Sequence, residues 1–144
     1  MEFSWQVYAV TAVLLFFKLL SNAIVQGLFR IKTKTFRHKE DATFFTRSEP
    51  ANHDDPIVIT ASNLFRNDLE NIPIFLFLLL GYVQLDCWEE GTVLYSGLFV
   101  LSRILHAIFY YIPRQPWRNI SYDLGIGSML AISFHILQSV FSGF

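Results

Sequence analysis

The sequence predicts an all-α integral membrane protein, a bundle of four helices that each cross the bilayer. Of the 144 residues, 53% are hydrophobic and 16% are charged, whereas soluble domains average about 25% charged residues. The hydrophobic residues gather in four runs, each near the ~20 residues that a helix needs to cross the hydrocarbon. Residues 74–80, within the densest part of the second run at residues 72–80, show none of the alternation of a membrane barrel strand. Helices are therefore expected, because they satisfy their own backbone hydrogen bonds in lipid.

The first predicted span covers residues 5–29 and holds Lys18 in its middle. No basic residue precedes it, and its hydrophobic run exceeds the roughly 7–15 residues of a signal peptide. We therefore expect a retained helix. A polar connection, residues 30–62, follows it.

The other predicted spans are residues 63–85, 92–112 and 117–141. Pro73 lies inside the second span, where its ring removes a helical hydrogen bond and should kink the helix. The connections between these spans are short, so consecutive helices should be antiparallel neighbours. The prediction is one four-span domain over residues 1–144.

Basic residues predict the orientation of the spans. Residues 30–62 carry six Lys and Arg residues, and the connection before the fourth span carries Arg114, with Arg118 at its edge. The second connection carries none. The positive-inside rule therefore places the first and third connections in the cytoplasm and both termini on the opposite side.

Polar residues concentrate near the predicted cytoplasmic ends of the spans. A charge in hydrocarbon costs roughly 2.5–3.5 kcal/mol and by default marks function. Spacings of three, four and seven residues put these side chains on shared helix faces. The three stripes are Asn63, Arg66, Asn67 and Glu70; Arg103, His106 and Tyr110; and Arg118, Tyr122 and Gly125. Register and orientation together predict a polar pocket between helices that opens to the cytosol.

The residue types predict a small zwitterionic ligand with surplus negative charge, such as a peptide. Guanidiniums bind carboxylates in a bidentate fork, and the lone Glu70 suits an ammonium group. No pair of carboxylates, Ser–His–Asp order, zinc-ligand spacing or phosphate loop is evident. We expect no metal and no nucleic-acid partner. A single cysteine, Cys87, excludes an intrachain disulfide.

Four motifs follow one another along the chain. They are Phe36 with Glu40-Asp41-Ala42; Arg66-Asn67-Asp68-Leu69-Glu70-Asn71-Ile72 with Pro73 nearby; Arg103-x-x-His106-x-x-x-Tyr110; and Gln115-Pro116-x-Arg118-x-x-x-Tyr122. In order and spacing they resemble the MAPEG family, the membrane-associated proteins of eicosanoid and glutathione metabolism. The most similar branch looks like the type 1 microsomal glutathione transferases, with the membrane prostaglandin E synthases as near relatives.

The resemblance implies a homotrimer that binds glutathione between neighbouring subunits. It implies a multi-pass protein of the endoplasmic reticulum or mitochondrial outer membrane with its site facing the cytosol. The glutathione-binding residues that it implies are Arg30, Arg66, Asn67, Glu70, His106, Tyr110, Arg118 and Tyr122. Arg118 would stabilise the thiolate, and Asp41 would act from behind the site or as a gating acid.

The chemistry of glutathione agrees with this residue set. Arg30 and Arg66 suit its two carboxylates, and Glu70 suits its ammonium group. Lowering a thiol pKa of about 8.5 by ~2 units requires about 2.7 kcal/mol of anion stabilisation, which Arg118 and Tyr122 can supply. The predicted enzyme is a glutathione transferase of detoxification that attacks lipophilic electrophiles and also reduces lipid hydroperoxides.

Two alternatives stay open. A prostaglandin E synthase-like isomerase is disfavoured because Asn119 stands where that enzyme has Ser. A non-catalytic lipid-binding scaffold is disfavoured because Arg118 and Tyr122 are present. The family often has Arg and His where this chain has Asn63 and Phe65.

Several polar residues have a plain structural interpretation. Arg66 and Glu70 could form only an ion pair four residues apart. Lys18, Arg103 and His135 are expected to make contacts between helices and not to bind glutathione.

Overall fold

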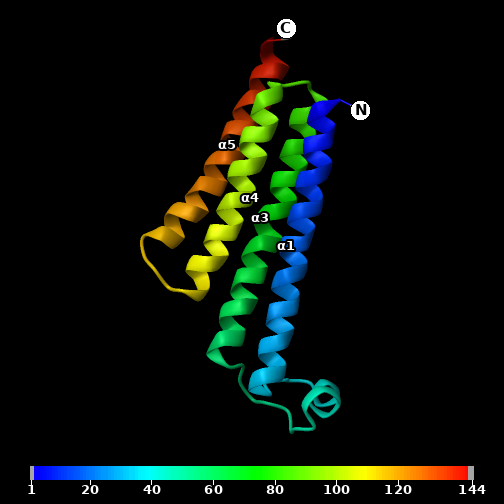
Figure 1. The fold of residues 1–144 in the computed structure, drawn as a ribbon, viewed down its shortest axis with the longest axis vertical. Coiled ribbons are helices and arrows are strands. Elements are labelled where there is room, and N and C mark those ends of the chain that lie inside the picture. Colours follow the sequence, from blue (N-terminus) through cyan, green and yellow to red (C-terminus); the bar gives the residue numbers. More distant parts are fainter. Residues whose placement is uncertain (1, 143–144) are drawn as a thin grey trace.

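The structure, a computed structural model, describes residues 2–142, and almost all of that chain is helical (Figure 1). The elements are α1 (Phe3–Thr33), α2 (Lys39–Asp41), the π-helix η1 (Ala42–Thr46), α3 (Pro56–Gln84), α4 (Glu89–Tyr111) and α5 (Trp117–Ser142). The predicted all-α class is confirmed.

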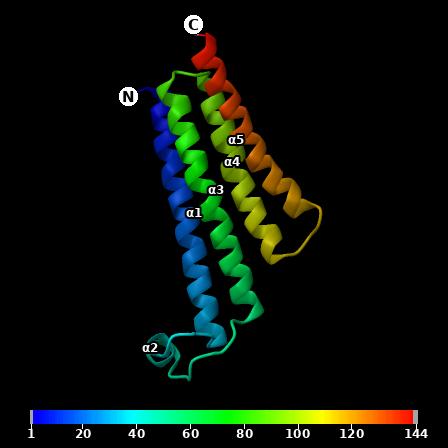
Figure 2. The ribbon, with the colours of Figure 1, turned by 180° about the vertical axis from the view of Figure 1, so that it is seen from behind.

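The long helices α1, α3, α4 and α5 run antiparallel in chain order. Both ends of the chain lie at one end of the molecule, while the α1–α3 connection and the α4–α5 turn lie at the other (Figures 1 and 2). Helix α1 packs on α3 and α4, and α5 packs on α4 and α3. The first turns of α5 diverge from α3 in both views.

Three helices, α1, α4 and α5, are long and apolar enough to cross a membrane. Helix α3 contains the second predicted span but is not among these three. Its residues 72–80 are apolar, but the preceding turns carry Arg66, Asp68 and Glu70. Length and composition therefore support a membrane protein without establishing four spans.

The helices extend beyond the predicted spans at several ends. Helix α3 begins at Pro56 and not near residue 63, because the Asp55 carboxylate accepts a hydrogen bond from the Ile57 N–H at 2.9 Å and caps the helix. Proline at the first helical position suits such a start. The predicted polar connection therefore contains the first turns of α3 as well as α2 and η1. Pro73 does not end α3, which continues to Gln84.

The apolar core occupies the half of the bundle nearer the chain ends. Each long helix contributes a completely buried side chain, Leu15, Phe75, Phe99 and Ile132 respectively. The rings of Phe75 and Phe99 stack with their centroids 3.7 Å apart and their planes 4° apart. This core holds the four long helices together, and the buried charged residues Asp68 and Arg103 lie in the other half.

The turn between α3 and α4 is held by polar contacts within an aromatic cluster. The Tyr82 hydroxyl donates to the Trp88 carbonyl at 2.8 Å, and Tyr95 Oη lies 3.1 Å from His135 Nε2. His135 therefore makes a contact between helices, as expected. The Cys87 thiol donates to the His135 carbonyl at 3.8 Å.

Burial raises the pKa of the Cys87 thiol, so this group stays protonated at neutral pH. Because the thiolate is the reactive form, Cys87 should react with N-ethylmaleimide more slowly than free glutathione does at pH 7. Mass spectrometry of the detergent-solubilised protein over time measures this rate. The same protein unfolded in dodecyl sulfate is the control, and equal rates for folded protein and free thiol would contradict the prediction.

Candidate functional site

A buried ion pair joins α1 to α3 in the polar half of the bundle. The Asp68 carboxylate on α3 is 0% exposed. Lys18 Nζ donates to Asp68 Oδ2 at 2.7 Å and to Asn22 Oδ1 at 2.9 Å, and Asn22 Nδ2 also donates to Asp68 Oδ2 at 2.7 Å. A buried charge requires a partner and hydrogen bonds to offset its desolvation. Lys18 therefore makes the contact between helices that its position predicted.

Arg103 on α4 is also 0% exposed and reaches both α3 and α5. Its Nη1 lies 4.0 Å from Asp68 Oδ1 and donates to Asn67 Oδ1 at 3.3 Å. Its Nη2 donates to the Tyr122 carbonyl at 3.4 Å. Its guanidinium carbon lies 5.5 Å from the centre of the Tyr122 ring and 5.2 Å from that of Phe99. One side chain thus connects three helices.

Gly125 makes room for Arg103. A Cβ at this position would collide with the Arg103 guanidinium and lie 2.7 Å from Ser102 Oγ. Sequence analysis placed Gly125 on the stripe of Arg118 and Tyr122. The structure gives it the role of admitting a large charged side chain between α4 and α5.

His106 on α4 is 5% exposed and lies next to this network. Its Nδ1 lies 3.2 Å from the Arg118 carbonyl, which can only accept, so Nδ1 carries the proton in neutral His106. Its Nε2 then offers a lone pair, and this buried atom has no hydrogen-bond partner within residues 2–142. The His106 ring centre lies 5.5 Å from that of Tyr110 and 5.8 Å from that of Tyr122.

The Arg118 side chain is half-buried at the start of α5. Its guanidinium carbon lies 5.4 Å from the centre of the Tyr110 ring, within the range of a cation–π contact. In the described part of the chain, no acidic side chain pairs with it. Its hydrogen-bond donors therefore remain available to an anion.

The structure brings five of the predicted site residues together. Asn67 and Tyr122 share Arg103 as a partner, His106 contacts Tyr110 and Tyr122, and Arg118 lies over Tyr110. The five are Asn67, His106, Tyr110, Arg118 and Tyr122. Four of them lie where α4 ends and α5 begins, which is also where α5 diverges from α3, and Asn67 joins them from α3.

Arg66 and Glu70 do not join this group, contrary to the predicted pocket between the helices of one chain. Both are exposed, as is Asn63, on the face of α3 that points away from the bundle. The three do share a face, as predicted. Helix α3 is rotated so that Asp68 and Asn71 face inward instead, because the buried carboxylate must meet its cations. Arg66 and Glu70 form no ion pair with each other among the salt bridges of residues 2–142.

Arg30 lies in the last turn of α1 and Asp41 at the end of α2. The end of α1 lies beyond the α4–α5 turn, beside the α1–α3 connection (Figure 1). Arg30 and Asp41 both line a hollow of about 250 Å³. Arg30 donates to the two Asp54 carboxylate oxygens at 3.0 and 3.4 Å, and Arg37 also lies 3.4 Å from Asp54. The charge of Arg30 is therefore balanced within the chain, whereas Asp41 is exposed.

Sequence analysis missed Asp68. The signal was present, because a cation in the middle of a span, Lys18, requires a nearby acid. Spacings of three, four and seven residues from Asn63 selected Arg66, Asn67 and Glu70, and Arg66 and Glu70 lie on the exposed face of the same helix. Arg103, expected only to contact a neighbouring helix, also holds two predicted site residues.

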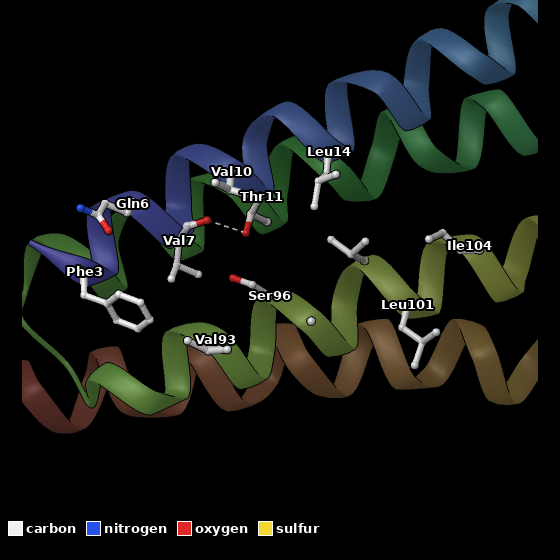
Figure 3. A pocket seen from close by; sticks show the side chains of 12 residues that line it. Phe3, Gln6, Val7, Val10, Thr11, Leu14, Val93, Ser96, Leu101 and Ile104 are labelled. Atoms are coloured by element: carbon white, nitrogen blue, oxygen red, sulfur yellow. Dashed lines mark hydrogen bonds between the residues drawn. The ribbon is translucent and has the colours of Figure 1, made fainter.

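A hollow of about 580 Å³ lies between α1 and α4 in the half nearer the chain ends (Figure 3). Apolar side chains such as Val7, Leu14 and Leu101 line it, and no charged residue does. None of the predicted site residues lines it. It therefore suits an apolar molecule and not a charged peptide.

Comparison with known proteins adds an independent observation. Residues 8–138 match the MAPEG family. The chain is similar to microsomal glutathione S-transferase 1 of Sus scrofa and of Homo sapiens, each 31% identical over 136 residues that cover 92% of this chain and 88% of the relative. It is also similar to prostaglandin E synthase of Macaca fascicularis, 29% identical over 131 residues that cover 90% of this chain and 86% of the relative. The family is the one that the four sequence motifs resemble.

Replacing Gly125 with Ala should destabilise the protein by about 1–3 kcal/mol, as overpacking of a filled core does. The added methyl group would displace the buried Arg103 from its contacts with Tyr122. Thermal unfolding in detergent measures the change. Gly127→Ala is the matched control, because nothing lies within 4 Å of a Cβ at Gly127 and Ala stabilises a helix by up to about 1 kcal/mol relative to Gly. Equal midpoints for the two variants would contradict this account of Gly125.

Proposed function

The chain belongs to the MAPEG family, and from this membership and the geometry of its site we propose that it is a membrane glutathione transferase. It activates glutathione as a thiolate, which attacks lipophilic electrophiles. Relatives named glutathione S-transferase and prostaglandin E synthase, at about 30% identity, support a glutathione-dependent transferase or isomerase. The conjugating activity is the more specific part of the proposal.

The observation that best supports this proposal is the half-buried Arg118 guanidinium. It stacks on Tyr110 and meets no acid of the described chain, so its positive charge is not cancelled internally. A cation in a partly dehydrated site stabilises a developing anion far more than it would in water. The site therefore favours the thiolate of glutathione over its thiol.

In the proposed reaction the thiol proton leaves to solvent and the thiolate remains beside Arg118. A guanidinium offers only donors and keeps its charge, so Arg118 stabilises the sulfur anion and accepts no proton. The sulfur electron pair then forms a bond to the electrophilic carbon. The bond from that carbon to the leaving group breaks, and the leaving group departs with the electron pair of that bond. Tyr122 would donate a hydrogen bond to the thiolate, while His106 and Tyr110 would contact the rest of the peptide.

We propose that the active form is a homotrimer of four-span subunits. Arg66 and Glu70 lie exposed on the outward face of α3, where a neighbouring subunit would bring them to the α4–α5 group. Arg66 would then bind a glutathione carboxylate and Glu70 the ammonium group. Arg30 would bind the second carboxylate by exchanging its contact with Asp54, with Asp41 behind it.

The acceptor and location follow from the same proposal. An electrophile or lipid hydroperoxide dissolved in the bilayer would reach a thiolate held at the end of the bundle. The basic residues of the α1–α3 connection support a cytosolic position for that end, in the membrane of the endoplasmic reticulum or the mitochondrial outer membrane. With a hydroperoxide, the thiolate sulfur would attack the terminal oxygen and release an alkoxide, and a second glutathione would give the disulfide and water.

A prostaglandin E synthase-like isomerase is the second candidate. Its support is the 29% identity to prostaglandin E synthase of Macaca fascicularis. Asn119, which follows Arg118, favours the transferase, because the family resemblance places Ser at that position in the isomerase. Assaying conjugation and endoperoxide isomerisation on one preparation distinguishes the two.

Arg118→Ala should lower kcat/KM for conjugation of 1-chloro-2,4-dinitrobenzene by about 10²–10³-fold, the loss typical of removing one anion-stabilising donor. Binding of glutathione should be partly retained, because other residues hold its carboxylates and ammonium group. Arg114→Ala, in the exposed α4–α5 turn, is the control. Unchanged turnover in the Arg118 variant would remove this residue from its role.

Glu70→Gln should weaken glutathione binding by roughly tenfold, because a hydrogen bond to a charged group contributes about 1.5–3 kcal/mol. Isothermal titration of the purified protein with glutathione measures the affinity. Glu90→Gln, an exposed acid at the opposite end of the bundle, is the matched control. Equal affinity of the Glu70 variant and the unmodified protein would exclude the ammonium contact.

A further inference from the structure

Arg103 touches two of the residues that the proposed function assigns to glutathione, although it is itself completely buried. It donates to the Asn67 side chain on α3 and to the Tyr122 main chain on α5. Because it is 0% exposed, it cannot meet a ligand directly. Any effect on binding must pass through the two groups that it holds.

The contact with Arg103 determines which way the Asn67 amide points. A guanidinium has donors and no acceptor, so the Asn67 atom that faces it must be the carbonyl oxygen Oδ1. The amide nitrogen Nδ2 then points away from Arg103. No hydrogen bond of Nδ2 is found within residues 2–142, and the Asn67 side chain is only half-buried. Asn67 is thus set to offer a donor outward from the network.

The Asp68 carboxylate offsets the cost of burying the positive charge of Arg103. Its Oδ2 accepts hydrogen bonds from Lys18 and Asn22, while its Oδ1 lies 4.0 Å from Arg103 Nη1 and accepts no hydrogen bond from the described residues 2–142. Asp68 therefore acts on Arg103 through charge and not through a direct hydrogen bond. Without this carboxylate, two cations would share one dry space and repel each other.

We propose that Asp68 and Arg103 are positioning residues of the glutathione site. They fix the Asn67 amide so that Nδ2 donates a hydrogen bond to an anionic group of glutathione, and they hold the Tyr122 main chain in place. This inference rests on the proposed function, because it assigns a purpose to residues behind that site. Asn67 then acts as a hydrogen-bond donor to glutathione. Arg103 affects glutathione binding only indirectly, because it is completely buried.

The variant Asn67→Asp distinguishes a role in orienting a hydrogen-bond donor toward glutathione from a role in the stability of the fold. The new carboxylate can still accept from Arg103, now as an ion pair, but it has no donor for the ligand. The thermal midpoint of this variant should be equal to or above that of the unmodified protein. Its glutathione affinity, measured by isothermal titration, should fall by roughly tenfold or more, the effect of losing a hydrogen bond to a charged group.

Asn63→Asp is the matched control for the added negative charge. Asn63 is exposed one turn earlier on α3. Its substitution should leave the thermal midpoint unchanged and weaken glutathione binding much less than Asn67→Asp does. An equal loss in both variants would show that charge alone weakens binding, and it would overturn the donor role of Asn67.

A double variant, Lys18→Met with Asp68→Asn, tests Asp68 without changing the net buried charge. Arg103 then lacks its carboxylate, so the KM for glutathione should rise severalfold, while kcat at saturating glutathione stays within about twofold because Arg118 is intact. An unchanged KM in a folded double variant would overturn the role of Asp68. If the unmodified protein binds no glutathione at all, the proposed function fails; if it binds and Asn67→Asp binds equally, only the positioning inference fails.

Discussion

Asp68 carries a negative charge inside an apolar bundle, between Lys18 on α1 and Arg103 on α4. Desolvating three charges is unfavourable unless they lie close together, so the four long helices must keep the rotation that joins them. Arg103 extends the constraint to α5 through the Tyr122 carbonyl, and Gly125 is the residue that leaves space for it. The inward face of α3, and with it the outward position of Arg66 and Glu70, follows from this one network.

The bundle is divided along its length between apolar packing and polar chemistry. Toward the chain ends, stacked Phe75 and Phe99 form a core that excludes polar ligands. Toward the α4–α5 turn, the half-buried Arg118 guanidinium and half-buried amide and phenol groups suit an anionic peptide. Under the proposed function this division matches the two substrates, since glutathione comes from water and its acceptor from the bilayer. The buried network then supports the site from behind while Arg118 faces the reacting sulfur.

Sequence patterns predicted the all-α class and the grouping of His106, Tyr110 and Arg118, because these depend on spacing and on the antiparallel order of α4 and α5. The same sequence patterns did not predict which face of α3 turns toward the other helices. Periodicity shows which residues share a face but not which face turns inward, and here the inward face carries Asp68 together with the buried Leu64 and Phe75. The early start of α3 was missed because its capped first turns are polar. Under the proposed function, Arg66 and Glu70 complete the site of a neighbouring subunit, which the pattern within one chain does not specify.

The central claim is that the site holds glutathione as a thiolate. Ultraviolet difference titration of the purified protein with glutathione at neutral pH tests it most directly, with S-methylglutathione, which has no thiol, as the control ligand. The account predicts a saturable thiolate absorbance with glutathione that is absent with the control and lost in Arg118→Ala. Glutathione binding, established by calorimetry, without any thiolate absorbance would contradict it.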